Sequence, residues 1–323
     1  MLIPLKFTPI YKERIWGGRE LEKIGKVLPK SGLIGESWEI SDVKGDESIV
    51  TGGMFEGNSL SELIEVYMEE LLGDKVFQKF STEFPLLIKF IDARDKLSIQ
   101  VHPDDELAAS RHHSYGKTEM WYVLSCDEGA QLYCGFNRKV TKEEYQTYVD
   151  NGTLEQILNK IDVKTGDAFF IPAGEIHAIG KGIVIAEIQQ TSDITYRVFD
   201  WNRVDENGEG RELHTQLALD AINFESEYDS NNTITPTFKN NEAVKMQSCE
   251  YFATNVIATD SSIERDLASI DSFVIYIALD GDMVIKYNGG ELNISQGDTI
   301  LVPAITNEVS IIGQGRLIEV YIP

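Results

Sequence analysis

The sequence has few cysteines, no long apolar run and no basic leader, and each shortage excludes a class of protein. Its 323 residues include three cysteines, an odd number that argues against a disulfide framework. No apolar stretch approaches the roughly 20 residues that a membrane-spanning helix requires. The N-terminal stretch "MLIPLKFTPIYKERIWGG" has neither the basic leader nor the small-residue cleavage site of a secretory signal. We therefore expect a cytoplasmic protein that does not enter a membrane.

Basic residues are also scarce, since 29 Lys and Arg stand against 53 Asp and Glu and give a net charge of −24. This charge repels phosphate backbones, so nucleic acid and anionic membrane surfaces are not expected partners. An anionic small substrate would need a local basic pocket, yet no glycine-rich phosphate loop is present. Four basic residues are possible contacts for an anionic group such as a phosphate, none of them favoured by pattern: Lys89, Arg94, Lys96 and Arg203. The pattern of residues does not indicate an oligomeric state.

Hydrophobic periodicity predicts a mainly β chain into which helices are inserted. Residues 58–80 have apolar positions with a period of about 3.6, which predicts a helix. The period changes to about 2 over residues 84–103, which predicts strands. A second helix is predicted over 141–161, and short strands between Gly and Pro turns follow over 162–201.

A polar, Asn-rich segment over residues 225–243 has no apolar periodicity and is typical of a connection between domains. We place the boundary near residue 240. The expected domains are residues 1–240, which carry the helical insertions, and residues 241–323, which read as β throughout.

The two predicted domains share a sequence repeat. The segments "GDAFFIPAGEIHAI" (166–179) and "GDTILVPAITNEVSI" (297–311) both have Gly-Asp, four mainly apolar residues and Pro-Ala. This similarity predicts two related β-barrels. In the second copy Glu308 replaces His177, and Phe273 aligns with Glu119. If the polar groups of the first barrel bind a metal, only the first barrel should hold one.

The candidate metal ligands are Gln100, His102, Glu119 and His177. Residues 100 and 102 alternate with apolar neighbours, so their side chains share one face of a strand. Two imidazoles and a carboxylate suit zinc or another divalent first-row metal. Three protein ligands with an open position are more typical of a catalytic than of a structural site. Gln100 can add an amide oxygen.

The stretch "GDAFFIPAGEIHAIG" resembles the second cupin motif at Gly166, Pro172, Gly174 and His177. Across the whole chain, six segments in this order resemble the type I mannose-6-phosphate isomerases, particularly the short bacterial form. They are "IWGG", "GESWEIS", "LSIQVHPDDELA", "GKTEMWYVL", "IPAGEIHAIG" and "TSDITYRVFDW". The resemblance implies two cupin-like, jelly-roll β-barrels, the C-terminal one degenerate and without metal, and helical insertions in the N-terminal catalytic part.

The resemblance also implies an activity and a set of site residues. The activity is zinc-dependent interconversion of mannose 6-phosphate and fructose 6-phosphate through a cis-enediol, with one Zn²⁺ per chain. The metal ligands carry over to Gln100, His102, Glu119 and His177. The family's catalytic arginine carries over to Arg197, and its other active-site positions to Lys117, Glu187 and Asp193. The substrate would be a small sugar phosphate.

These residue types suit proton transfer between adjacent carbons, which builds negative charge on an enediolate oxygen. A metal or a fixed guanidinium lowers that barrier electrostatically, and Arg197 cannot lose its charge. The base stays open among Lys117, Glu187 and Asp193. Two other classes also fit two His and a carboxylate: a non-haem iron oxygenase, and a non-catalytic sugar-binding regulator.

Overall fold

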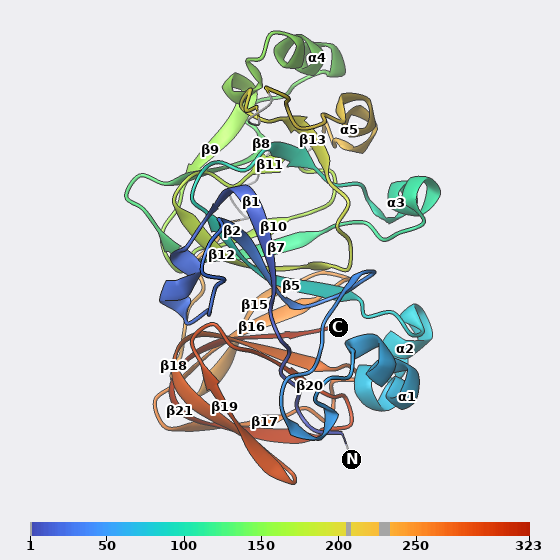
Figure 1. Ribbon diagram of the computed structural model, residues 1–323, viewed down its shortest axis with the longest axis vertical. Helices are drawn as coiled ribbons and strands as arrows, with labels where there is room; N and C mark the ends of the chain where they lie inside the picture. The colour runs from blue at the N-terminus through green and yellow to red at the C-terminus, as the bar shows by residue number, and fades with distance from the viewer. Residues whose placement is uncertain (1, 205–207, 226–232) are drawn as a thin grey trace.

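The computed structural model describes residues 2–204, 208–225 and 233–323. This part of the chain is mainly β, which confirms the mainly β part of the predicted fold class. Three large sheets lie in layers, with short helices at their edges (Figure 1). The smaller elements are a hairpin of β3 (Asp42–Val43) and β4 (Asp46–Glu47) and the 3₁₀ turns η1 (Glu20–Ile24) and η2 (Gly53–Phe55). The sheets do not establish closed barrels, so the two-barrel description stays a prediction.

The first large sheet, here called the central sheet, lies between the other two. Its strands in spatial order are β1 (Ile10–Gly18), β2 (Ile34–Ile40), β5 (Leu86–Ala93), β12 (Ile183–Gln190), β7 (Glu119–Cys126), β10 (Ala168–Ile171) and β14 (Thr233–Ile234). In β7, Trp121 and Val123 enter one hydrophobic core, and Met120 and Tyr122 enter another. A strand buried on both faces reads as a continuous apolar run, as "EMWYVL" does.

The five-stranded sheet packs on one face of the central sheet, where Leu132 and Cys134 share a core with Trp121. Its strands in order are β13 (Tyr196–Phe199), β6 (Ile99–Val101), β11 (His177–Ala178), β8 (Gln131–Phe136) and β9 (Leu158–Asp162). Helices α4 (Lys142–Asp150) and α5 (Thr215–Ala221) supply Tyr145 and Ala218 to the core on its far side. The helix predicted over 141–161 is too long. It ends at Asp150, because Gly152 adopts a positive φ of 66°, and η3 (Leu154–Ile157) and β9 follow.

The third sheet, the C-terminal sheet, packs on the opposite face of the central sheet. Its strands are β15 (Glu242–Ser248), β16 (Ala253–Thr259), β21 (Glu308–Tyr321), β18 (Val274–Tyr287) and β19 (Gly290–Ser295), with β17 (Ser262–Asp266) on β21 and β20 (Thr299–Val302) on β18. In the repeat, Ile171 pairs with Glu119 and Val302 pairs with Val274. Val274 therefore occupies the place of Glu119. The alignment with Phe273 is wrong by one residue, a slip that exchanges the two faces of a strand.

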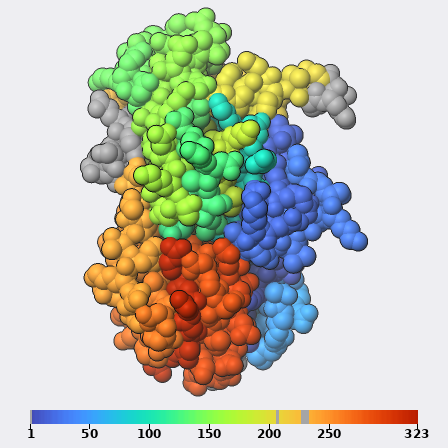
Figure 2. All heavy atoms as spheres, turned by 90° about the vertical axis from the view of Figure 1, so that its left-hand side faces the viewer, coloured from blue at the N-terminus to red at the C-terminus, as the bar shows by residue number. Residues whose placement is uncertain are grey.

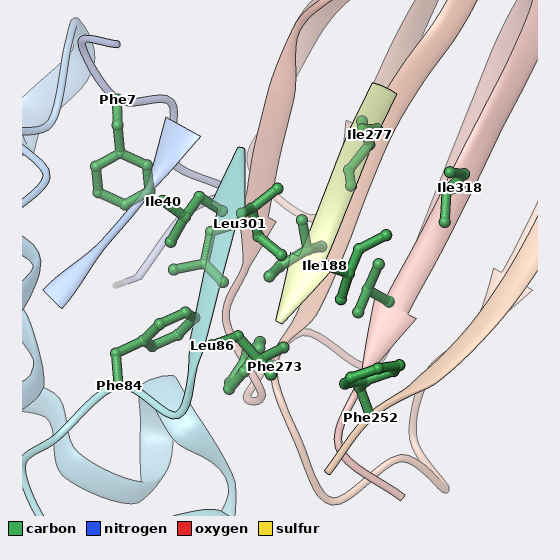
Figure 3. Close-up of a cluster of buried hydrophobic side chains, with 14 of the residues drawn as sticks. Phe7, Ile40, Phe84, Leu86, Ile188, Phe252, Phe273, Ile277, Leu301 and Ile318 are labelled. Carbon is green, nitrogen blue, oxygen red and sulfur yellow. The ribbon is translucent and has the colours of Figure 1, made fainter. Parts of the chain in front are cut away.

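One hydrophobic core joins the central and C-terminal sheets (Figure 3). It contains Phe84, Leu86 and Ile188 from the central side and Phe252, Phe273, Ile277 and Ile318 from the C-terminal side. The predicted helix over 58–80 is two helices, α1 (Leu60–Leu72) and α2 (Asp74–Phe80), which meet at Gly73. The backbone of Leu72 accepts a hydrogen bond from Phe273 N at 3.1 Å.

The N-terminal residues also cross to the C-terminal sheet. Leu5 and Leu301 form an antiparallel bridge, with Leu5 N 2.8 Å from Leu301 O. In Figure 2 the blue N-terminal part runs alongside both the green and the orange-red parts of the molecule. The Leu5–Leu301 and Leu72–Phe273 contacts therefore both join residues on opposite sides of the boundary predicted near residue 240.

Candidate metal centre and active-site cavity

Three predicted ligands come together between the central sheet and the five-stranded sheet. His102 follows β6, Glu119 begins β7 and His177 begins β11, and each is at most 1% exposed. His102 Nε2 is 3.3 Å from Glu119 Oε1, and His177 Nε2 is 3.7 Å from Glu119 Oε2. One ligand atom from each residue lies within 4.8 Å of the others. Three segments that are distant in sequence thus meet at one buried point.

Backbone carbonyls orient both imidazoles. His102 Nδ1 lies 2.9 Å from Ile194 O, and His177 Nδ1 lies 2.8 Å from Glu175 O. A carbonyl oxygen can only accept, so each Nδ1 carries the hydrogen and donates it. Each Nε2 then presents a lone pair toward the carboxylate, which is the arrangement that outer partners impose on metal-binding histidines.

The charge states of the group agree with that orientation. Burial lowers the pKa of His102 to about 3 and also lowers the pKa of His177, so both rings are neutral. Burial by itself raises the pKa of Glu119, but the Lys117 ammonium and the two imidazoles hold this pKa well below its usual range. Lys117 Nζ is 2.8 Å from Glu119 Oε1. Among the described residues, no group meets the angular criteria for a hydrogen bond to either Glu119 oxygen or to His102 Nε2, so the Lys117 ammonium pairs with Oε1 by charge alone.

These donors fit a metal ion. Two unprotonated nitrogens and a carboxylate that face one another repel unless a cation lies between them, and buried polar atoms are rarely left without partners. Gln100 belongs to the same group, because its Nε2 lies 3.4 Å from His177 Nε2 and β6 pairs Gln100 with His177. The residues that could hold a metal are therefore His102, Glu119, His177 and, beside them, Gln100.

A cavity of about 540 Å³ opens next to this group. Gln100 and Lys117 line it, so the residues that contact His177 and Glu119 also face its interior. The other charged residues in the lining are Lys12, Glu13, Arg14, Glu36, Asp46, Lys89, Glu187, Asp193, Arg197 and Arg211. Six bases against five acids make the lining slightly positive in a protein with a net charge of −24. A local environment of this kind suits an anionic ligand.

All four predicted catalytic residues line the cavity: Lys117, Glu187, Asp193 and Arg197. Glu187 is buried between Lys89, 2.9 Å away, and Trp121, whose Nε1 donates to it at 2.9 Å. Burial, followed by the charge of Glu119, raises the pKa of Glu187. Asp193 is exposed at the edge of the cavity.

Arg197 lies on β13, and backbone contacts fix it. Its Nη1 donates to Glu212 O at 2.9 Å, and its backbone N donates to His214 Nδ1 at 3.1 Å. Its buried Nε has no hydrogen-bond partner among the described residues. Burial and the nearby Arg211 lower the pKa of Arg197 from its ordinary value. Arg197 therefore lines the cavity with at least one guanidinium donor, Nε, that is free to bind a ligand.

Several lining residues were not identified as functional from the sequence. In the segments "IWGG" and "GESWEIS", Glu36 accepts from Arg14 Nε at 2.8 Å and from Trp38 Nε1 at 2.6 Å. Gly35 lets β2 approach β1, because a Cβ there would lie 2.6 Å from side-chain atoms of Arg14 and Trp16. The two motifs thus build one wall of the cavity, and their resemblance to the family was the available signal.

The phosphate candidates divide clearly. Lys89 lines the cavity, whereas Arg94, Lys96 and Arg203 do not. Arg211, which no sequence pattern indicated, does line it and is held by Asp200 through contacts of 2.8 Å from Nε and 2.6 Å from Nη2.

In the described residues, no helix is long and apolar enough to cross a membrane.

The fold and the site define the class of protein. A mainly β chain that encloses a buried group of two His and one Glu beside a charged cavity is typical of the cupins. Residues 242–322 match "Mannose-6-phosphate isomerase, cupin domain", and residues 4–127 match "Phosphomannose isomerase type I, catalytic domain".

Individual relatives narrow the class. The chain is 34% identical over 319 residues to a mannose-6-phosphate isomerase of Bacillus subtilis, covering 98% of each. It is 44% identical over 223 residues to a mannose-6-phosphate isomerase of Streptococcus mutans, covering 69% of this chain and 68% of the relative. The crystal structure of the mannose 6-phosphate isomerase from Bacillus subtilis matches with a TM-score of 0.85 at 33% identity over 99% of both chains. The chain belongs to the type I phosphomannose isomerase family and is an isomerase.

Proposed function

We propose that this protein is a zinc-dependent isomerase that interconverts mannose 6-phosphate and fructose 6-phosphate through a cis-enediol. One observation carries the proposal: a buried His, Glu and His group with two unprotonated nitrogens borders a cavity that Arg197 faces and whose lining has a slight excess of basic residues. The relatives' names supply the substrate. The sugar-binding regulator is set aside because the chain belongs to a family of enzymes.

The metal ligands in this proposal are His102, Glu119, His177 and Gln100. The amide of Gln100 presents Nε2 toward His177, and a half-turn of the amide would bring Oε1 to the same place, since the two orientations have nearly the same shape. When bound, zinc supplies a Lewis acid that polarises a sugar oxygen. We expect one zinc per chain, because Val274 and the exposed Glu308 stand where the first copy has Glu119 and His177.

The chain's own residues perform the proton transfer. Arg197 stabilises the negative charge that develops on the sugar oxygen, because its guanidinium is fixed and always charged. Lys117 and Glu187 are the buried titratable groups among the predicted acid–base residues that line the cavity, which supports them as the groups that move the proton between C1 and C2. Asp193 lies at the exposed edge, where it can act on the open end of the sugar.

Arg211 binds the phosphate away from the metal ligands, because it lines the cavity and its guanidinium can pair with a dianion. Asp200 keeps Arg211 in place. The domain division stays part of the proposal: residues 1–240 carry catalysis, and residues 241–323 hold no metal.

The proposal is tested by a coupled assay of mannose 6-phosphate isomerisation before chelation, after chelation and after zinc is restored. We expect activity to disappear with the metal and to return with zinc. Activity that survives complete metal removal refutes zinc dependence. Oxygen consumption without isomerisation would instead identify the iron oxygenase.

A further inference from the structure

The segment "HPDDE" places two aspartates at the start of α3 (Asp105–His112), and they have different partners. Asp104 is the helix cap, because its Oδ1 accepts from Leu107 N at 2.8 Å. Asp105 instead accepts at Oδ1 from Gly116 N at 2.8 Å and from Gln190 Nε2 at 2.9 Å. Its Oδ2 accepts from Tyr251 Oη at 3.0 Å. The second aspartate therefore joins three separate parts of the chain.

The contacts of Asp105 enclose the residues on both sides of Lys117. Gln190 receives Thr118 N on its Oε1 at 2.8 Å and donates from Nε2 to Asp105. Lys117 N itself donates to Pro103 O at 3.1 Å. The backbone N–H groups of residues 116, 117 and 118 are thus all occupied, and two of them depend on Asp105 directly or through Gln190.

Close packing adds to this restraint. A Cβ on Gly116 would lie 2.6 Å from Asp105 N and 2.7 Å from Asp104 C. The loop before Lys117 is therefore pressed against the first turn of α3 and has no room to shift toward it. Lys117 Nζ lies 2.8 Å from Glu119 Oε1, and this restrained backbone fixes the point from which the Lys117 side chain extends.

Tyr251 comes from the other side of the predicted domain boundary, in the turn between β15 and β16. Its hydroxyl donates to the Asp105 carboxylate and orients it. The C-terminal part, which supplies none of the proposed metal ligands, therefore contacts the residue that restrains the backbone around Lys117. Among the residues that the structure describes, none beyond residue 211 lines the cavity. The C-terminal part thus contacts the residues that support the site and does not line the cavity itself.

We propose that Asp105 is a positioning residue that fixes Lys117 for catalysis and that Tyr251 of the C-terminal part holds Asp105 in place. The inference rests on the active-site role of Lys117 in the proposed function. It assigns the C-terminal part a contribution to turnover through one hydrogen bond.

The test compares kcat, KM and bound zinc in the full-length variants Asp105→Ala, Asp105→Asn, Tyr251→Phe and the double variant Asp105→Ala with Tyr251→Phe. We expect Asp105→Ala to lower kcat about ten- to a hundredfold per bound zinc, with KM nearly unchanged, because small misplacements of reacting groups cost that much. Asp105→Asn keeps an Oδ1 acceptor and should restore most of kcat. Tyr251→Phe should lower kcat by less, and it should add nothing to Asp105→Ala, since both act through one contact.

Two matched controls separate positioning from folding. Asp104→Ala removes the helix cap one residue away and should lower Tm without lowering kcat per bound zinc. Tyr115→Phe removes a hydroxyl that bonds Glu83 rather than Asp105 and should leave kcat unchanged. The inference is overturned if Asp105→Ala keeps the wild-type kcat, or if the effects of Asp105→Ala and Tyr251→Phe simply multiply. A wild-type protein without isomerase activity would instead overturn the proposed function.

Discussion

Zinc should stabilise the folded protein by an amount that depends on His177. Without a cation, the two Nε2 lone pairs face a carboxylate at 3.3 and 3.7 Å, in a site that is almost fully buried. An ion that binds this folded arrangement but not the unfolded chain stabilises it by about 4 kcal/mol when its free concentration is about 1,000 times Kd. One kcal/mol shifts the Tm of a chain of this size by about 2 °C or slightly less, so the expected gain is about 6–8 °C.

The assay is thermal unfolding of chelated protein with and without added zinc. His177→Ala also leaves a cavity and lowers the starting Tm, so the quantity to compare is the zinc-dependent gain within each variant. We expect no gain in His177→Ala and a full gain in Glu308→Ala, the corresponding position of the repeat. A full gain in His177→Ala, or its loss in Glu308→Ala, would show that the ion binds elsewhere.

Three further predictions concern the cavity wall and the central sheet. Arg197→Ala should keep its zinc and lose kcat by on the order of 10²-fold or more, and a wild-type rate in the coupled assay would remove Arg197 from catalysis. Gly35→Ala should lower the free energy of unfolding by about 1–3 kcal/mol, because its Cβ would lie 2.6 Å from Arg14 and Trp16 atoms; urea unfolding measures this, and an unchanged midpoint contradicts it. Burial raises the pKa of Asp92 to about 6, above the roughly 4 of an unfolded chain. The folded state therefore binds more protons at Asp92 between these values, and the contribution of Asp92 to stability should be lost as pH rises from about 4 through 6. In urea titrations the stability of the wild type relative to Asp92→Asn should decline across this range, and an identical pH dependence of the two proteins would refute the assignment.

The sequence predicted the β class and the residues that the structure brings together at the centre. This worked because strand alternation fixes which side chains share a face, as for Gln100 and its neighbours. The second half of the helix expected over 141–161 failed because Gly152 and the pairing of β9 with β8 outweigh a helical pattern. Arg211 and Lys12 could not be identified from the sequence as cavity-lining residues. A cavity wall is assembled from distant segments, and no local sequence pattern shows which of them lie close together.

The alignment of Glu119 with Phe273 illustrates a second limit. Both Phe273 and Val274 are apolar and buried, so composition alone does not distinguish them. Pairing with Val302 does distinguish them, since register is a property of two strands. Likewise, the two aspartates of "HPDDE" look equivalent as helix caps until their partners are seen.

The core between the central and C-terminal sheets contains residues from both sides of the boundary proposed near residue 240. A fragment ending near residue 240 would uncover the underside of the central sheet, where Phe84, Leu86 and Ile188 lie. Apolar faces of that kind drive self-association in water. The C-terminal residues 241–323 therefore keep the rest of the chain dispersed as well as folded, because they cover this apolar face.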